Sequence, residues 1–162
     1  MSTAQRKLSE FDLTNVPLKD DLKIGLVVSQ WNPEITRALK KGAIDTLKTS
    51  GLSSEQILNW EVPGSFELIY GCQKMMSQHQ YLDAIIAIGS VIEGETKHFD
   101  FVCSGVTQGI KDLNVMGVIP VIFCVLTDQN LEQAQARSGG KFGNKGAEAA
   151  VAALQMATLG NY

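Results

Sequence analysis

The sequence predicts an α/β fold in which helices cover both faces of a parallel sheet. Strongly apolar runs of strand length alternate along the chain with segments whose apolar residues recur at helical spacing. The apolar runs are nearly continuous, which is typical of strands that are buried on both faces. Strand and helix in regular alternation favour right-handed crossovers between parallel strands. With 162 residues, of which 44% are hydrophobic, we expect one domain, 1–162, with an ordinary core and no dividing linker.

The chain is expected to begin with a polar arm, residues 1–22, which has two candidate docking places, the sheet edge and a neighbouring subunit. A short strand around Phe11–Leu13 is one option within it. Residues 23–29 are nearly all apolar and predict a central strand. Asn32 and Pro33 then suit a helix start, with a capping side chain followed by proline at the first helical position. One apolar helical face follows, made by Ile35, Leu39, Ala43 and Leu47, before a glycine at position 51.

A second strand and helix are predicted in the next third of the chain. Residues 56–61 form a shorter strand, and residues 62–65 turn the chain. Ser65 is the expected cap of a helix over 66–77. Residues 83–90 then predict the third strong strand.

The remaining elements follow a polar loop, residues 89–96. A helical pattern comes next, carried by Val102, Val106, Gly109, Ile110 and Leu113. Residues 121–127 predict the fourth strand, and a short helix ends near Arg137. A glycine-rich link, 138–143, leads to a last helix that starts at Asn144. Its apolar face consists of Ala147, Ala150, Val151 and Leu154.

Composition argues against several function classes. A net charge of -3 disfavours nucleic-acid binding through a basic surface. No apolar run approaches the roughly 20 residues that span a bilayer, and the first residues lack the apolar core of a secretory signal, so we expect a cytoplasmic protein. Cys72, Cys103 and Cys124 are predicted to be buried thiols in a reducing compartment. No motif for a metal, dinucleotide, phosphate-binding loop or nucleophile elbow is present.

Candidate chemistry gathers at the strand ends. The carboxyl ends of parallel strands meet at one rim, where helix N-termini suit an anion such as phosphate. The residues placed there are Trp31, Ser65, Phe66, Glu67, the segment 90–98 and the segment 123–127. Their convergence predicts a ligand site more strongly than any single residue does.

Each candidate has a second interpretation. His98 suits a general acid or base, but it is equally a capping or surface histidine. Trp31 suits stacking on a flat ring, although a lone tryptophan is more often a packing residue. Glu67 either accepts hydrogen bonds from ligand hydroxyls or favours the first helical turn. Arg137 either binds phosphate or is an ordinary residue at the C-terminal end of a helix. Lys145 is more often a solvated surface lysine than a ligand-binding one.

Five ordered blocks of the sequence are Trp31-Asn32, VPGSFEL at 62–68, GSVIEGETKHFDFV at 89–102, PVIFCVLTDQNLEQAQAR at 120–137 and GNKGAEAA at 143–150. In this order and at these intervals they resemble the lumazine synthase family of riboflavin biosynthesis. The resemblance implies a flavodoxin-like three-layer α/β/α sandwich with a four-stranded parallel sheet. It also implies a transferase that condenses 5-amino-6-(D-ribitylamino)uracil with 3,4-dihydroxy-2-butanone 4-phosphate. The products are 6,7-dimethyl-8-ribityllumazine, phosphate and water, and no cofactor is used.

The resemblance further implies roles for individual residues. His98 is the expected proton-transfer residue. The residues expected to bind the ribitylaminouracil are Trp31, Ser65, Phe66, Glu67, Ser90, Val91, Ile92, Phe123 and Lys145. Those expected to bind the butanone phosphate are Glu95, Thr96 and Arg137. Phe123, Arg137 and Lys145 are expected to arrive from the adjacent subunit.

Assembly follows from the same resemblance. Family members form pentamers with active sites between subunits, and some close twelve pentamers into a hollow shell. The short link 138–143 favours the 60-subunit shell, with association with riboflavin synthase as a further expectation. Glu93 and Cys124 stand where many members have arginine and glycine, which puts affinity in doubt more than activity. The rival functions are a non-catalytic flavin binder and a structural shell protein.

Overall fold

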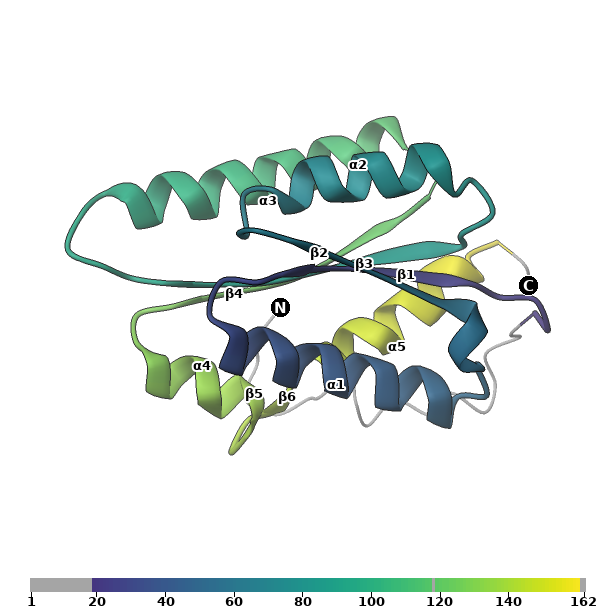
Figure 1. Cartoon of the computed structure of the whole chain (residues 1–162), viewed down its shortest axis with the longest axis horizontal. Helices are drawn as coiled ribbons and strands as arrows, with labels where there is room; N and C mark the ends of the chain where they lie inside the picture. The colour runs from purple at the N-terminus through teal and green to yellow at the C-terminus, as the bar shows by residue number, and fades with distance from the viewer. Residues whose placement is uncertain (1–18, 118, 161–162) are drawn as a thin grey trace.

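A four-stranded, all-parallel sheet forms the centre of the molecule (Figure 1). The computed structural model describes residues 19–117 and 119–160. The strands are β1 (Ile24–Ser29), β2 (Ile57–Val62), β3 (Ala84–Ile92) and β4 (Val121–Asp128). Their order is β2-β1-β3-β4, so β1 and β3 occupy the centre and are the most continuously buried strands. This arrangement confirms the predicted parallel sheet and the central place of the first strand.

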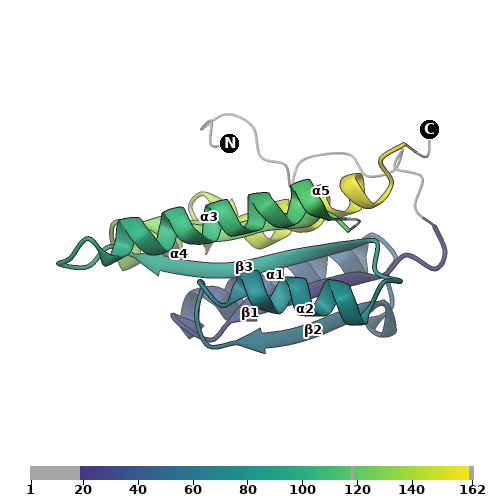
Figure 2. The same cartoon turned by 90° about the horizontal axis from the view of Figure 1, so that it is seen from above.

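Helices cover both faces of the sheet, as predicted. The helices are α1 (Pro33–Thr49), the 3-10 turn η3 (Ser54–Gln56), α2 (Leu68–Gln78), α3 (His98–Met116), α4 (Leu131–Arg137) and α5 (Lys145–Ala157). Helices α2 and α3 lie side by side on one face, α2 nearer β2 and α3 nearer β4 (Figure 2). Helices α1, α4 and α5 lie on the other face (Figure 1). The fold is therefore a three-layer α/β/α sandwich of the flavodoxin type.

The side-chain alternation of the strands divides the core into two layers. Leu26 and Val28 of β1 pack with α1 and α5, whereas Val27 packs with α2. In β3, Ile86 likewise packs on the face covered by α1 and α5, and Ile85 packs on the face covered by α2 and α3. Each such buried side chain contributes roughly 1.5–3 kcal/mol of transfer free energy, so both faces of the sheet need a helical cover.

Helix α1 begins at Pro33 directly after Asn32, as predicted, but two of the expected side-chain caps are wrong. Asn32 adopts a left-handed conformation, φ 53°, and its side chain makes no capping bond to α1. Its Nδ2 instead donates to the carbonyl of Ser90, 3.1 Å away. Ser65 lies before the start of α2, and its hydroxyl donates to the same carbonyl at 3.4 Å. Both side chains thus bond to the carbonyl of Ser90 in β3, which is distant in sequence, and neither caps the helix that follows it.

The link 138–143 is not a plain loop. Ser138–Gly140 (β5) and Gly143–Asn144 (β6) form a small antiparallel pair. Gly139 has φ 130°, a left-handed conformation that favours glycine. Asn144 caps α5 as predicted, because its Oδ1 accepts from the amides of Gly146 and Ala147.

The predicted burial of the cysteine thiols is confirmed for two of the three residues. Cys72 and Cys124 are buried, and burial raises the pKa of each thiol to about 12. Cys103 is only half-buried, and it lies in the second turn of α3, before the first fully buried residue of that helix, Val106. The arm 1–22 with its strand around Phe11–Leu13 falls almost wholly outside the described residues. None of the described helices combines the length and the apolar character needed to cross a membrane.

Candidate active site

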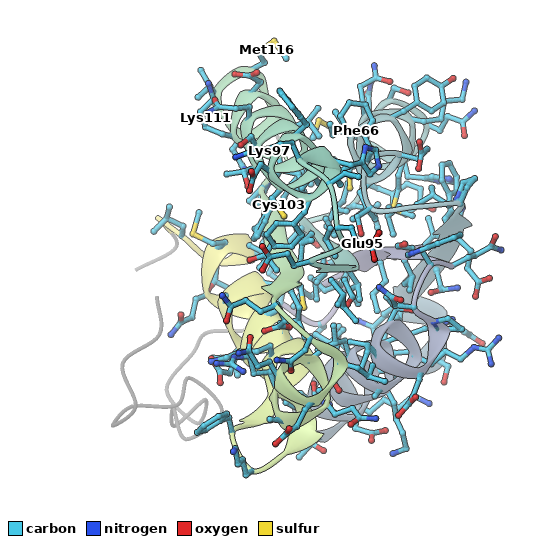
Figure 3. All side chains as sticks on the ribbon, turned by 90° about the vertical axis from the view of Figure 1, so that its left-hand side faces the viewer. Phe66, Glu95, Lys97, Cys103, Lys111 and Met116 are labelled. Carbon is cyan, nitrogen blue, oxygen red and sulfur yellow. The ribbon has the colours of Figure 1, made fainter. Side chains whose placement is uncertain are left out.

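A cleft of about 660 Å³ opens at the carboxyl ends of the strands. Figure 3 looks toward this end of the sheet and shows Phe66, Glu95 and Lys97 on it, whereas Met116 lies at the other end of α3. The cleft is lined by Trp31, Gly64, Ser65, Phe66, Glu67, Ser90, Val91, Ile92, Gly94, Thr96, His98, Phe99, Phe101 and Val102. The structure therefore brings together most of the residues that the strand ends predicted.

The end of β3 forms the floor of the cleft. Ser90 is 1% exposed, and its carbonyl accepts the two hydrogen bonds from Asn32 and Ser65. The Ser90 hydroxyl has no hydrogen-bond partner among the described residues. A Cβ on Gly89 would lie 2.7 Å from the hydroxyl of Ser65, so glycine is needed for this close approach. The floor is thus rigid and carries a free hydroxyl.

Two aromatic side chains form the walls. Trp31 is 71% exposed and Phe66 is 52% exposed, which is unusual for side chains of this size. The Phe66 ring lies between α2 and α3 (Figure 3), and a Cβ on Gly105 would lie 2.7 Å from its Cε2. Exposed rings held in this way can stack on a flat ligand.

The N-terminus of α3 forms one end of the cleft. His98 is the first residue of this 19-residue helix, its ring is exposed, and its backbone amide donates to Thr96 Oγ1 at 3.3 Å. The first amides of a helix have no partner in the helix and carry partial positive charge, which suits an anion. A proton donor or acceptor and an anion site therefore lie side by side.

Glu95 is not among the residues that line the cleft. It lies in a neighbouring hollow of about 190 Å³ with Glu93 and Lys97. Thr96 borders both spaces. Within one chain, Thr96 thus lines the cleft and Glu95 lies beside it, and contact of both residues with one phosphate stays a prediction.

A second hollow, of about 380 Å³, lies at the free edge of β4, and we call it the β4-edge hollow. Phe123, Arg137 and Lys145 line it, so the predicted common rim is divided in one chain. Lys145 Nζ lies 2.8 and 2.9 Å from the two carboxylate oxygens of Glu148. The β4-edge hollow therefore contains two cations, partly balanced by carboxylates.

Several lining residues were not predicted. Phe99, Phe101 and Val102 of α3 line the cleft, and Asp128 and Glu148 line the β4-edge hollow. The aromatic residues that follow His98 in the first helical turn were a usable signal. Asp128 directly follows the predicted fourth strand, but nothing local distinguishes it from an ordinary turn residue.

Within 19–117 and 119–160, no group of three or more His, Cys, Asp or Glu side chains is placed to bind a metal.

Comparison with known proteins gives a consistent result. The family model described as 6,7-dimethyl-8-ribityllumazine synthase matches residues 21–161. A protein of that name from Christiangramia forsetii is 61% identical over 98% of this chain and 95% of its own length. Proteins of the same name from Flavobacterium johnsoniae and Porphyromonas gingivalis are 59% and 54% identical over 98% of this chain, and over 83% and 98% of their own lengths. The chain therefore belongs to the 6,7-dimethyl-8-ribityllumazine synthase family.

Proposed function

We propose that two copies of this chain build each active site, the cleft coming from one subunit and the β4-edge hollow from the next. Membership of the family makes the chain a transferase of riboflavin biosynthesis. The reaction is the condensation of 5-amino-6-(D-ribitylamino)uracil with 3,4-dihydroxy-2-butanone 4-phosphate to 6,7-dimethyl-8-ribityllumazine, phosphate and water.

One observation carries the composite site. Of the described residues that line the cleft, none is lysine or arginine. One substrate carries a phosphate, which needs positive charge, and a helix N-terminus supplies only a partial charge. Arg137 and Lys145 line the β4-edge hollow instead. The β4-edge hollow thus supplies the positive charge that the cleft lacks.

The ribitylaminouracil would stack between aromatic rings in this arrangement. Trp31 supplies one exposed ring from the cleft, and Phe123 of the adjacent subunit supplies another. Ser65 and Glu67 would bind the ribityl hydroxyls, with Phe66 beside the chain. The uracil edge would meet the end of β3, at Ser90, Val91 and Ile92.

The butanone phosphate would lie between the α3 N-terminus and the β4-edge hollow. Thr96 and the first amides of α3 would bind its phosphate on one side, with Glu95 beside them. Arg137 from the adjacent subunit would bind the phosphate on the other side, and Lys145 would approach both substrates.

The chemistry consists mainly of proton movements. The uracil amine attacks the ketone carbon, and loss of water gives an imine. Removal of a proton from the adjacent carbon then expels inorganic phosphate from the next carbon and leaves an enol. The enol takes up a proton to give a methyl ketone, and the second amine attacks this ketone and closes the ring with loss of water. His98 stands at the α3 N-terminus, where it could take and return these protons. Holding both substrates together supplies much of the acceleration, roughly 7–11 kcal/mol in favourable systems.

A site shared between subunits requires an assembly. We infer pentamers, which bring each cleft against the β4-edge hollow of the adjacent subunit. The compact β5–β6 link carries no insertion, which favours closure into a 60-subunit shell. A single domain and a cytoplasmic location remain predictions from length and composition, and association with riboflavin synthase remains a prediction from the sequence resemblance.

A stopped assay with both substrates tests the function. Lumazine absorbance and phosphate release are followed together in the purified, folded and oligomeric protein. We expect equal amounts of the two products. A folded oligomer that forms neither product would contradict the proposal and favour the flavin-binder and shell readings.

A further inference from the structure

Asp128 is a buried carboxylate that none of the assigned roles explains. It is the last residue of β4 and is 5% exposed. Its carbonyl accepts the amide of Glu93 at 2.9 Å, which ties the end of β4 to the chain that leaves β3. Its side chain lines the β4-edge hollow. The backbone is therefore firmly placed, and the carboxylate faces the half-site that contains Arg137.

The carboxylate of Asp128 is incompletely paired. Its Oδ1 lies 3.7 Å from Arg137 Nη1, and its Oδ2 has no hydrogen-bond partner among the described residues. Burial raises the pKa of Asp128, and the guanidinium of Arg137 opposes that rise. A buried, half-satisfied carboxylate is costly for folding, so this side chain is poorly explained by stability alone.

Arg137, in contrast, is held on several sides. Its Nη1 donates to the carbonyl of Gln133 at 2.9 Å, one turn back along α4. The guanidinium carbon lies 5.1 Å from the ring centre of Phe142, a cation–π distance. The side chain remains 32% exposed toward the β4-edge hollow. Asp128 is the one anionic side chain that the described structure pairs with it.

We propose that Asp128 is a positioning residue that fixes the guanidinium of Arg137 in the orientation that binds the phosphate of the butanone phosphate. This inference rests on the proposed function of Arg137. Nη1 of Arg137 lies near both the carbonyl of Gln133 and the carboxylate of Asp128, and the ring of Phe142 lies against the guanidinium. Asp128 adds the only charged contact to Nη1 among the described residues, which leaves the remaining donors free to point into the β4-edge hollow. Asp128 itself contacts no substrate.

Asp128→Asn is the first test, because it keeps the side-chain shape and removes the charge. We expect KM for the butanone phosphate to rise roughly fivefold, which is the scale of one weakened charge-assisted contact. We expect KM for the ribitylaminouracil and kcat to change less than twofold. The inhibition constant of inorganic phosphate, used as a competitive inhibitor, should rise by the same factor. Asp112→Asn is the matched control, since Asp112 is an exposed carboxylate paired with Lys111 on α3.

A double-mutant cycle separates positioning from a purely structural role. In an Arg137→Ala background, Asp128→Asn should cause no further rise in KM, because its effect passes through Arg137. The melting temperature of Asp128→Asn should be equal to or higher than that of the wild type at neutral pH, because burial disfavours the Asp128 carboxylate more than Arg137 favours it, as the raised pKa of Asp128 indicates. A fivefold rise that persists without Arg137, an unchanged KM, or a lower KM would each overturn the inference.

A crystal structure of Asp128→Asn keeps this inference distinguishable from the proposed function. We expect the guanidinium of Arg137 to leave its place beside position 128. An unmoved guanidinium would contradict the positioning role even if the enzyme is active. If the guanidinium moves in the variant but the wild-type protein makes no lumazine, the positioning role is supported and the proposed function is contradicted.

Discussion

The two half-sites of this chain differ in how they are built. The cleft at the α3 N-terminus is aromatic, and its floor is fixed by hydrogen bonds to the carbonyl of Ser90. The β4-edge hollow is charged, and its cations Arg137 and Lys145 are held by nearby carboxylates. The cleft suits a flat ring and proton transfer, whereas the hollow suits a phosphate. In the proposed shared site neither hollow supplies all the groups alone, so we expect assembly and catalysis to depend on each other.

Arg137→Ala should give the largest effect, because it removes the charge that the cleft lacks. We expect kcat/KM for the butanone phosphate to fall about 100-fold, the scale of one lost electrostatic contact in a transition state. Steady-state kinetics with each substrate varied would measure it. Lys141→Ala is the control, since Lys141 also lies 5.1 Å from the Phe142 ring centre but does not line the β4-edge hollow. An equal loss in both variants would show that local charge, not Arg137, matters.

His98→Ala should lower kcat about tenfold without abolishing it. Water and solution buffers can move protons more slowly, and the holding of two substrates is unaffected. Turnover at saturating concentrations of both substrates would measure the change. Complete loss of activity in a folded, assembled variant would show that His98 does more than transfer protons.

Gly105→Ala should act on the aromatic wall of the cleft only. The added methyl group would lie 2.7 Å from Phe66 Cε2, so the ring must move. We expect KM for the ribitylaminouracil to rise about threefold, from partial loss of one aromatic contact. Ser104→Ala, one residue away and exposed, is the control. Equal KM values in both variants would mean that the position of Phe66 does not affect binding.

The smallest expected effect is a pH dependence of stability from Asp128. Its raised pKa means that the folded state binds this proton more tightly than the unfolded chain does. The resulting stabilisation is complete below the unfolded pKa, about 4, and is lost as pH rises through the folded pKa. The melting temperature of Asp128→Asn minus that of the wild type should therefore increase as pH rises. Glu61, whose pKa is lowered mainly by Gln30, has the opposite dependence but cancels in this comparison.

Melting curves at fixed subunit concentration from pH 4 to pH 7 would measure that difference. A constant difference between the two proteins would contradict the raised pKa of Asp128.

The sheet could be predicted from sequence because its strands are nearly continuous apolar runs with helices between them. The cleft could be predicted because parallel strands bring their carboxyl ends together. The capping roles of Asn32 and Ser65 could not be judged, because the competing acceptor, the carbonyl of Ser90, is distant in sequence. The role of Asp128 could not be predicted either, because its contact with Arg137 depends on how α4 folds back beside the end of β4.

Glu95 shows a different limit. The loop before α3 was correctly placed at the rim, but the backbone directs neighbouring side chains into different hollows. The division of the predicted rim also depends on the position of β4 at the sheet edge. That order of strands cannot be obtained from the pattern of apolar residues alone.

Co-assembly of two variants tests the shared active site most directly. Chains with His98→Ala are unfolded together with chains with Arg137→Ala, and the mixture is refolded into joint assemblies. If each site takes its cleft from one subunit and its β4-edge hollow from the next, about one site in four regains both native halves. The account predicts that the mixed assemblies exceed the activity of either parent. Activity equal to the average of the two parents, in assemblies shown to contain both chains, would contradict it.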